Sequence, residues 1–365
     1  MPGVYISYPF CAQKCTYCNF ASGVLPRELE RKYVEALRSE VGGHEWRWQP
    51  ETVYVGGGTP SQMAGPDLEK ILAAVPGRPW KEATIEAAPG TIDAQKAADW
   101  RRAGINRISL GVQSFVQREL ARTGRKHTAA IVAKEIEILR SAGLGNINID
   151  LIAGLPFQTT ETWRVSLDWV ERLNPPHVSV YMLEVDEDSR LGSEVLLNGK
   201  RYGAPEVPPE EQIAEFYEMA VRELARMGIN RYEISNFARP GFESTHNLKY
   251  WRLERYAGFG ADAHSFDGAL RWRNAESAEQ YVERAAAGQS PREAATAANA
   301  TEERFFVGLR LTSGIQPAAE EWRAFDAPIQ RFLSEGLLER VGNSLRLTNR
   351  GVLLSNEVFA EFLAA

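Results

Sequence analysis

Residues 5–23 read YISYPFCAQKCTYCNFASG and contain all three cysteines of the 365-residue chain, Cys11, Cys15 and Cys18. Three cysteines cannot all pair with one another, so a disulfide framework explains them poorly. Three thiolates on a loop that follows an apolar strand can instead converge on one soft metal centre. A structural zinc ion would need a fourth ligand, and the nearest histidine, His44, has nothing else to recommend it. A four-iron cluster with one open iron fits better than zinc or three incidental buried thiols.

Outward from this loop, short β-rich runs alternate with amphipathic stretches. The expected strands include VYIS, TVYVGGG, ATIEAAPG, RISLGVQS, NINIDLIAGLP and HVSVYMLEV, and helices are expected at 27–41, 66–75, 93–103, 128–142, 160–172 and 210–228. Strands separated by helices predict a parallel sheet whose ligands lie beyond the carboxyl ends of its strands. We therefore expect an α/β fold, a partial or full TIM-like (β/α) barrel.

The chain is expected to divide into a barrel domain at 1–285, a linker at 286–301 and a small module at 302–365. Residues 288–301 are Ala-rich with little apolar periodicity, which is typical of a linker. The residues that follow predict a helix, two short strands around Gly342 and Asn343, and another helix, which together form a winged-helix-like α+β module. Wings often bind DNA, but this one is not notably basic, so a packing or docking role is favoured.

Composition narrows the classes of function. The chain is 44% hydrophobic and 25% charged, with a formal net charge of −6. This balance lacks the cationic surface that phosphate backbones require, which disfavours nucleic acid partners, including the tRNA of an RNA-modifying enzyme. No apolar stretch is long enough to span a membrane. We expect no leader, because the residues before Cys11 do not combine a basic segment with an apolar run. We expect a cytoplasmic protein and leave peripheral membrane association open.

The spacing of the cysteines in CAQKCTYC resembles the C-x3-C-x2-C signature of the radical S-adenosylmethionine (SAM) superfamily. This resemblance implies that Cys11, Cys15 and Cys18 hold a [4Fe–4S] cluster and that SAM chelates its open iron. It also implies that the barrel is of the radical SAM type. A glycine run, YVGGGTP, matches the motif that this superfamily places after its second strand, where a Cβ would obstruct the methionyl group.

Further residues match the SAM contacts of the superfamily, in order along the chain and each at or near a strand. Singly, each is more often a loop-bonding or solvated side chain than a ligand; together they favour a SAM site. The resemblance implies SAM contacts at Tyr5, Gly57, Gly58, Glu86, Gln113, Arg125 and Asp150.

The stretches GGGTPS, GVQSF, DLIAGLP and HNLKYW resemble the oxygen-independent coproporphyrinogen III oxidase-like branch of the superfamily. Two functions occur in that branch: decarboxylation of two propionates of coproporphyrinogen III, and chaperoning of haem. The oxidase pattern continues to a fourth cysteine, where this chain has Phe20. The oxidase also has an N-terminal extension of several dozen residues, whereas in this chain ten residues precede Cys11. Both departures favour the chaperone.

The stretch THNLKYW, 245–251, matches the H-N-x-x-Y-W motif of the haem-chaperone members. The resemblance implies haem binding by His246, Tyr250 and Trp251, since an imidazole can be an axial ligand to haem iron and the aromatic rings offer flat apolar surface. A histidine beside two aromatic residues can equally be a satisfied core histidine, and that alternative stays open.

We therefore expect a haem chaperone that binds a [4Fe–4S] cluster, SAM and haem, passes haem to haem-accepting proteins and lacks coproporphyrinogen oxidase activity. No catalytic residue is assigned. The alternative is a radical SAM oxidoreductase of the coproporphyrinogen dehydrogenase type, which cleaves SAM to a 5'-deoxyadenosyl radical. Cleavage of SAM would require an electron donor. The resemblance leaves a homodimer open.

Overall fold

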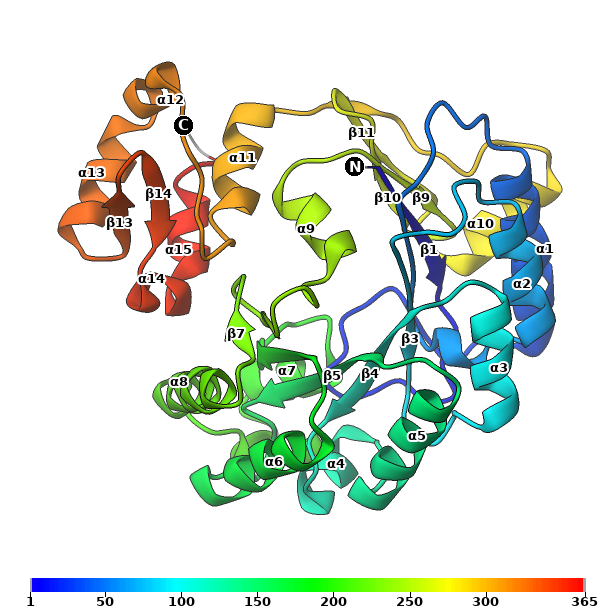
Figure 1. Cartoon of the computed structure of the whole chain (residues 1–365), viewed down its shortest axis with the longest axis horizontal. Coiled ribbons are helices and arrows are strands. Elements are labelled where there is room, and N and C mark those ends of the chain that lie inside the picture. Colours follow the sequence, from blue (N-terminus) through cyan, green and yellow to red (C-terminus); the bar gives the residue numbers. More distant parts are fainter. Residues whose placement is uncertain (1, 364–365) are drawn as a thin grey trace.

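One curved sheet organises most of the chain, and the computed structural model describes residues 2–363 of it. Six parallel strands cross its centre in sequence order, with no strand interposed. They are β1 (Gly3–Tyr8), β2 (Thr52–Gly57), β3 (Glu82–Ala87), β4 (Arg107–Gln113), β5 (Asn146–Ala153) and β6 (His177–Met182). Figure 1 shows helices packed along the outer side of this sheet. The predicted (β/α) alternation is confirmed.

The helices between these strands follow the apolar periodicity of the sequence. Their bounds agree with the expected ranges to within two residues: α1 (Arg27–Gly42), α2 (Gly65–Ala73), α3 (Ala94–Arg102), α5 (Ala129–Ser141), α6 (Thr160–Leu173) and α8 (Glu210–Arg226). In α6, for example, Trp163, Leu167 and Val170 lie on one face and are buried. Shorter elements were not expected: η1 (Pro60–Gln62), α4 (Gln117–Thr123), α7 (Arg190–Leu196) and η2 (Arg201–Glu206).

Additional strands extend the sheet at both ends. Beyond β1 lie β9 (Tyr256–Phe259), parallel to it, and then the antiparallel β10 (His264–Phe266), β11 (Leu270–Arg273) and β12 (Thr296–Ala297); beyond β6 lie β8 (Asn236–Ala238) and β7 (Asn230–Arg231). Within residues 2–363, the edge strands β7 and β12 do not pair, so the barrel is partial and not closed. Figure 1 shows α9 (Thr245–Trp251) between the two ends of the sheet.

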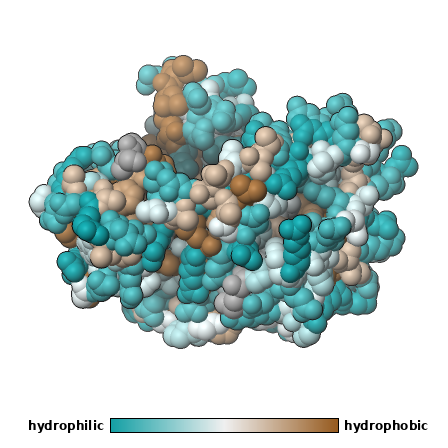
Figure 2. Space-filling view, turned by 90° about the horizontal axis from the view of Figure 1, so that it is seen from above, coloured by the Kyte–Doolittle hydropathy of each residue, from teal (hydrophilic) through white to brown (hydrophobic). Residues whose placement is uncertain are grey.

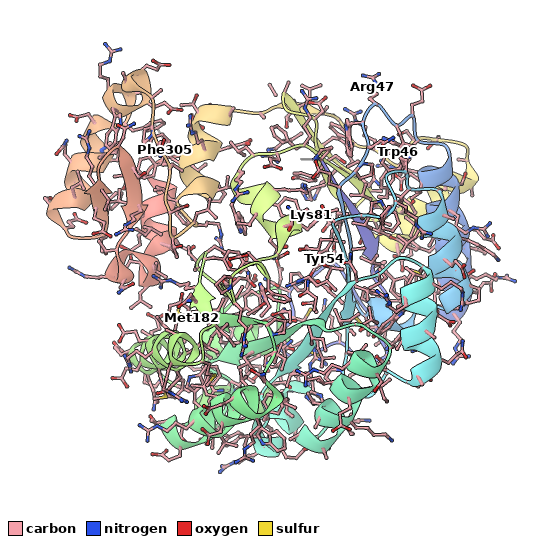
Figure 3. The ribbon with its side chains drawn as sticks, viewed as in Figure 1. Trp46, Arg47, Tyr54, Lys81, Met182 and Phe305 are labelled. Atoms are coloured by element: carbon pink, nitrogen blue, oxygen red, sulfur yellow. The ribbon has the colours of Figure 1, made fainter. Side chains whose placement is uncertain are left out.

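Alternation along the central strands separates an apolar outer face from a polar inner face. In β2, Val53 and Val55 are fully buried in the core, and Tyr54 points the other way. Figure 3 places Tyr54 on the inner side of the curved sheet, whereas Trp46 and Arg47 lie at the periphery. The inner face therefore offers hydrogen-bonding groups to a ligand.

The C-terminal module contains α11 (Ala300–Gly308), α12 (Ala319–Ala324), α13 (Asp326–Ser334), β13 (Leu338–Val341), β14 (Ser344–Leu347), α14 (Asn349–Leu353) and α15 (Ser355–Ala360). Its strands pair through a turn at Gly342, where φ is +61°. Phe305, labelled in Figure 3, packs on Phe325 and Phe362 with ring centroids 4.5 and 4.9 Å apart. The predicted helix, strand, strand, helix order is confirmed.

The segment expected as a linker lies along the edge of the large sheet. It follows α10 (Ala278–Ala286), carries β12, and its Glu293 carboxylate lies 2.9 Å from the Arg273 guanidinium. An Ala-rich sequence without periodicity is compatible with this path because backbone groups also make contacts; the Ala298 N–H, for example, donates to the Ala269 carbonyl at 2.8 Å. The segment between the two parts of the chain therefore packs against the large sheet.

The surface agrees with the polar composition. The face shown in Figure 2 is mostly hydrophilic, with apolar surface gathered chiefly on one projection. Across residues 2–363, no helix combines the length and the apolar character needed to cross a membrane.

Candidate functional site

The cysteine loop leaves the carboxyl end of β1 and is closed at its base. The N–H of Cys11 donates to the Gly23 carbonyl at 2.8 Å, and the N–H of Gly23 donates to the Pro9 carbonyl at 2.9 Å. All three cysteines are free thiols and partly exposed. Three unpaired thiols on one loop suit iron ligation chemically. In the described part of the chain, however, no three Cys, His, Asp or Glu side chains form a ready metal site, so the cluster ligands stay a prediction.

The glycine run after β2 lies directly against this loop. The N–H of Gly58 donates to the Tyr8 carbonyl at 2.7 Å. A Cβ at Gly58 would lie 2.7 Å from the Phe10 carbonyl oxygen and 2.9 Å from the Cys11 sulfur. Gly57 has φ +114°, which side chains rarely adopt. The sequence uses glycine here because two backbones must meet beside a thiol.

Glu86 lies behind the glycine run on the inner face of β3. Its carboxylate accepts hydrogen bonds from the Tyr54 hydroxyl at 2.9 Å and from the Gly57 N–H at 3.2 Å. Tyr5 stacks beside Tyr54, with ring centroids 6.2 Å apart. Burial raises the pKa of the Glu86 carboxyl to about 7, against the lowering effect of the Tyr54 hydrogen bond. The structure thus brings Tyr5, Gly57 and Glu86 together, and their contact with SAM stays a prediction.

Gln113 ends β4 at a bulge, in a left-handed conformation with φ 70°. The bulge turns its side chain away from the regular alternation of the strand. Its amide oxygen is buried and finds no hydrogen-bond partner among residues 2–363. A buried acceptor without a donor is costly unless a ligand supplies one. The orphaned oxygen therefore fits a site whose ligand carries N–H or O–H groups, as SAM does.

Arg125 connects this strand to the cysteine loop. Its Nε donates to the Tyr17 hydroxyl at 3.2 Å, and Tyr17 lies between Cys15 and Cys18. A Cβ at Gly111 would lie 3.2 Å from Gln113 Nε2 and 3.4 Å from an Arg125 guanidinium nitrogen. The guanidinium thus lies between the cysteine loop and the inner face of β4.

Asp150 occupies the inner face of β5. Its carboxylate accepts hydrogen bonds from the Asn148 amide at 2.7 Å and the Ser109 hydroxyl at 3.2 Å, and burial raises its pKa. The side-chain amide oxygen Oδ1 of Asn148 in turn lies 2.6 Å from Nδ1 of His177. Asp150 is therefore part of a polar network that runs along the inner face towards β6.

The haem motif forms α9, which lies at the end of the parallel strands opposite to the cysteine loop. His246 is buried, with Nδ1 2.8 Å from the Thr52 hydroxyl and Nε2 2.8 Å from the Tyr250 hydroxyl. Thr52 begins β2, whereas the cysteine loop follows the carboxyl end of β1. Burial lowers the pKa of His246 to about 3. Neither ring nitrogen is free to bind iron in this conformation, so His246 is not available as an iron ligand. The structure also does not bring His246 close to the cysteines, because the two lie at opposite ends of the parallel strands.

A carboxylate holds α9 in this position. Glu82, at the start of β3, accepts hydrogen bonds from the Ser244 hydroxyl at 3.0 Å, the Thr245 N–H at 2.7 Å and the His246 N–H at 3.0 Å. The Glu82 carboxylate thus accepts from backbone N–H groups that have no partner within the first turn of a helix. We call these three contacts the Glu82 clasp.

Trp251 is the last residue of α9 and of the haem motif. The Arg310 guanidinium carbon lies 4.5 Å from the centre of its ring. Its indole N–H is buried and, in the described part of the chain, makes no hydrogen bond. The motif therefore reaches from the barrel interior to α11.

Exposed apolar side chains border the cysteine loop. Phe20, where the oxidase pattern has a cysteine, is 66% exposed, and Leu197 beyond α7 is 78% exposed. The two segments contact each other: the Leu191 N–H donates to the Thr16 carbonyl at 2.8 Å. Phe20 and Leu197 thus form an exposed apolar rim beside the cysteine loop.

Sequence reasoning missed Tyr17, Tyr54 and Glu82. The alternation in TVYVGGG could have placed Tyr54 on the inner face with the glycines. Tyr17 lies between two cysteines, which is a weaker signal. Glu82 gave no signal, because its partner α9 lies about 160 residues further along the chain.

Comparisons with known proteins agree with these features. The Radical SAM superfamily model matches residues 5–170, and the HemN C-terminal domain model matches residues 295–354. "Heme chaperone HemW" of Bacillus subtilis (strain 168) is 35% identical over 381 residues, covering 100% of this chain and 99% of that protein. The protein of the same name from Lactococcus lactis subsp. lactis (strain IL1403) is 34% identical, with coverages of 98% and 96%.

A solved structure shares the fold. Coproporphyrinogen III oxidase (HemN) from Escherichia coli superposes with a TM-score of 0.83, covering 99% of this chain and 89% of that chain at 20% identity. This likeness supports the barrel and the C-terminal module alike. With full-length relatives above 30% identity, the chain belongs to the radical SAM superfamily and, within it, to the HemW family.

Proposed function

We propose that this chain is a haem chaperone, which binds haem and passes it to haem-accepting proteins. The observation that carries the proposal is similarity over the whole chain to proteins named heme chaperone HemW, with the HNLKYW motif present as α9. The three free thiols suit a reducing compartment, so we expect it to act in the cytoplasm.

The cluster and SAM would occupy the carboxyl end of the barrel. Cys11, Cys15 and Cys18 would hold a [4Fe–4S] cluster, and the glycine run would admit the methionyl part of SAM beside it. Glu86 would accept from ribose hydroxyls, and the orphaned Gln113 oxygen would accept a further donor. Gly58, Arg125, Asp150 and Tyr5 complete the proposed SAM contacts. When bound, the pair supplies one-electron chemistry, which would need an external electron donor.

Haem binding requires a change at α9. Because Thr52 and Tyr250 occupy both ring nitrogens of His246, the imidazole can reach iron only after α9 turns away from the barrel. Release of the Glu82 clasp would expose Tyr250 and Trp251 at the same time. In this proposal, the observed conformation is the haem-free state.

The chaperone function competes with coproporphyrinogen oxidation on the same scaffold. Phe20 and the HNLKYW motif favour the chaperone, and we expect no coproporphyrinogen turnover. A homodimer, in which one copy would cover the apolar rim of the other, is compatible with either activity.

The test is an anaerobic haem titration followed by Soret absorbance, on reconstituted wild type and His246→Ala. Coproporphyrinogen turnover is assayed on the same preparation. Stoichiometric haem uptake that the substitution weakens, without decarboxylation, supports the proposal. SAM-dependent decarboxylation without haem uptake would replace it with the oxidase.

A further inference from the structure

A cavity of about 430 Å³ lies where the barrel meets the C-terminal module. On the barrel side it is lined by Arg231 of β7 and by Ile234. On the module side it is lined by the segment after α11, by β13 and β14, and by the start of α14. Figure 1 shows these elements on the two sides of the junction. The cavity is separate from both the cysteine loop and the inner face of the barrel.

Three arginines line this cavity against a single carboxylate. Arg231, Arg310 and Arg346 lie on its wall, and Glu339 is the acidic residue among the lining side chains. Arg346 Nε donates to Glu339 at 2.8 Å, and Arg231 Nη2 donates to the Asn349 amide oxygen at 2.9 Å. Positive charge therefore exceeds negative charge, and we call the cavity the arginine pocket.

Arg310 is the least satisfied of the three. Its Nε is buried and, within residues 2–363, has no hydrogen-bond partner; the Glu233 carboxylate lies 3.9 Å away, too far for a hydrogen bond. The Glu233 oxygen that faces it is also buried without a hydrogen bond in the described part of the chain. The Arg310 guanidinium is therefore held by an ion pair and not by a hydrogen bond, and an oxyanion that enters the pocket would offer it a hydrogen-bond acceptor.

Arg310 also connects the pocket to the haem motif. Its guanidinium stacks over Trp251, the last residue of α9, with a carbon-to-centroid distance of 4.5 Å. A ligand that contacts α9 and carries carboxylates on flexible arms could therefore reach the three arginines. Haem has two such arms, on one edge of an apolar ring.

We propose that the arginine pocket binds the propionate carboxylates of haem. This inference rests on the proposed haem chaperone function and assigns to the pocket only the carboxylates, because three arginines lie among its twelve lining residues. Guanidinium groups suit carboxylates since they offer paired N–H donors in one plane. The pocket sets the orientation of haem relative to α9 and selects porphyrins with free acid arms.

The experiment compares haem with haem dimethyl ester, in which both propionates are masked, in the same dilute detergent. Each is titrated into the reconstituted full chain as wild type, Arg346→Gln and Arg231→Gln/Arg346→Gln. Arg331→Gln is the matched control, because Arg331 lies in the same module and pairs with Glu335 and Glu361 outside the pocket. Thermal unfolding of each variant verifies folding.

We expect wild type and the Arg331 control to bind haem roughly tenfold or more tightly than the ester, as befits charged hydrogen bonds. The double variant should bind haem about as weakly as wild type binds the ester, with little change for the ester. If wild type binds both ligands equally, or if the pocket variants keep the full preference for haem, the assignment of propionates is wrong.

Two further outcomes separate the causes of failure. If inorganic phosphate weakens haem binding in wild type while the ester binds as tightly as haem, the pocket is a phosphate site and the propionate assignment falls. If wild type binds neither haem nor ester, the haem chaperone function fails, and the pocket proposal falls with it.

Discussion

The Glu86 carboxylate accepts a hydrogen bond from the Tyr54 hydroxyl at 2.9 Å inside the barrel. Burial nevertheless raises the pKa of Glu86 to about 7, from an ordinary value of 4.5. The folded chain therefore holds a proton at pH values where the unfolded chain has lost it. The proposed ribose-binding acid is thus only partly ionised at neutral pH.

Glu86 should make the protein less stable as pH rises. Between pH 4.5 and about 7 the folded state binds more protons at this site, so its contribution to the free energy of unfolding falls by up to about 1.4 kcal/mol per pH unit and levels off above pH 7. Glu86→Gln should remove that slope. Urea unfolding of both proteins across this range measures the difference; parallel pH profiles would contradict the raised pKa.

His246 should give the opposite pH dependence. Its pKa falls to about 3 because burial disfavours the imidazolium, so below pH 6.5 the unfolded state binds more protons. Stability from this group is complete above pH 6.5 and is lost as pH falls towards 3. His246→Gln should flatten the acid limb of the stability profile, measured by the same unfolding experiment. A variant that steepens this limb would show that the ring is charged when folded.

These two slopes overlap between pH 4.5 and 6.5 and have opposite signs. The contributions of Glu86 and His246 to the pH dependence of wild type should therefore largely cancel in this range. Only the separate variants can reveal each contribution, because the compensation is a sum over both sites.

The local parts of the site were predictable from sequence. Cys11, Gly57 and Glu86 lie at or near the ends of the first three parallel strands, and the carboxyl ends of such strands meet at one edge of a sheet. Hydrophobic alternation placed the strands, and apolar periodicity placed the helices between them. Both patterns extend over ten or twenty consecutive residues, so they can be recognised in a single sequence.

The position of the haem motif was not predictable in this way. HNLKYW contains groups that suit haem, but whether His246 faces solvent or the interior depends on Thr52 and Glu82, which lie far away in sequence. No local pattern encodes that pairing. The edge strands β10 to β12 were missed for a similar reason, since they are short and owe their pairing to the sheet beside them.

A methyl group at Gly58 should disturb the cluster without a change of charge. The Cβ of Gly58→Ala would lie 2.9 Å from the Cys11 sulfur and 2.7 Å from the Phe10 carbonyl, so the loop must shift, at a cost of about 1–3 kcal/mol. Iron and sulfide content after anaerobic reconstitution should fall. Gly42→Ala is the control, because a Cβ at that position would have no neighbour within 4 Å and its content should match wild type. Normal cluster content in Gly58→Ala would show that Cys11 is not a ligand in this position.

Loosening the Glu82 clasp should speed haem uptake. Glu82→Gln replaces an acceptor with an N–H donor facing backbone N–H groups of α9, and a shift of about 1–2 kcal/mol raises the released population by a factor of about 5–30. Stopped-flow Soret measurements give the rate of uptake. Glu135→Gln is the matched control, because Glu135 also accepts backbone N–H groups, from Gly90 and Ile92, at another place in the barrel. Equal acceleration by both variants would point to general destabilisation, and an unchanged rate in Glu82→Gln would show that haem binds with α9 in place.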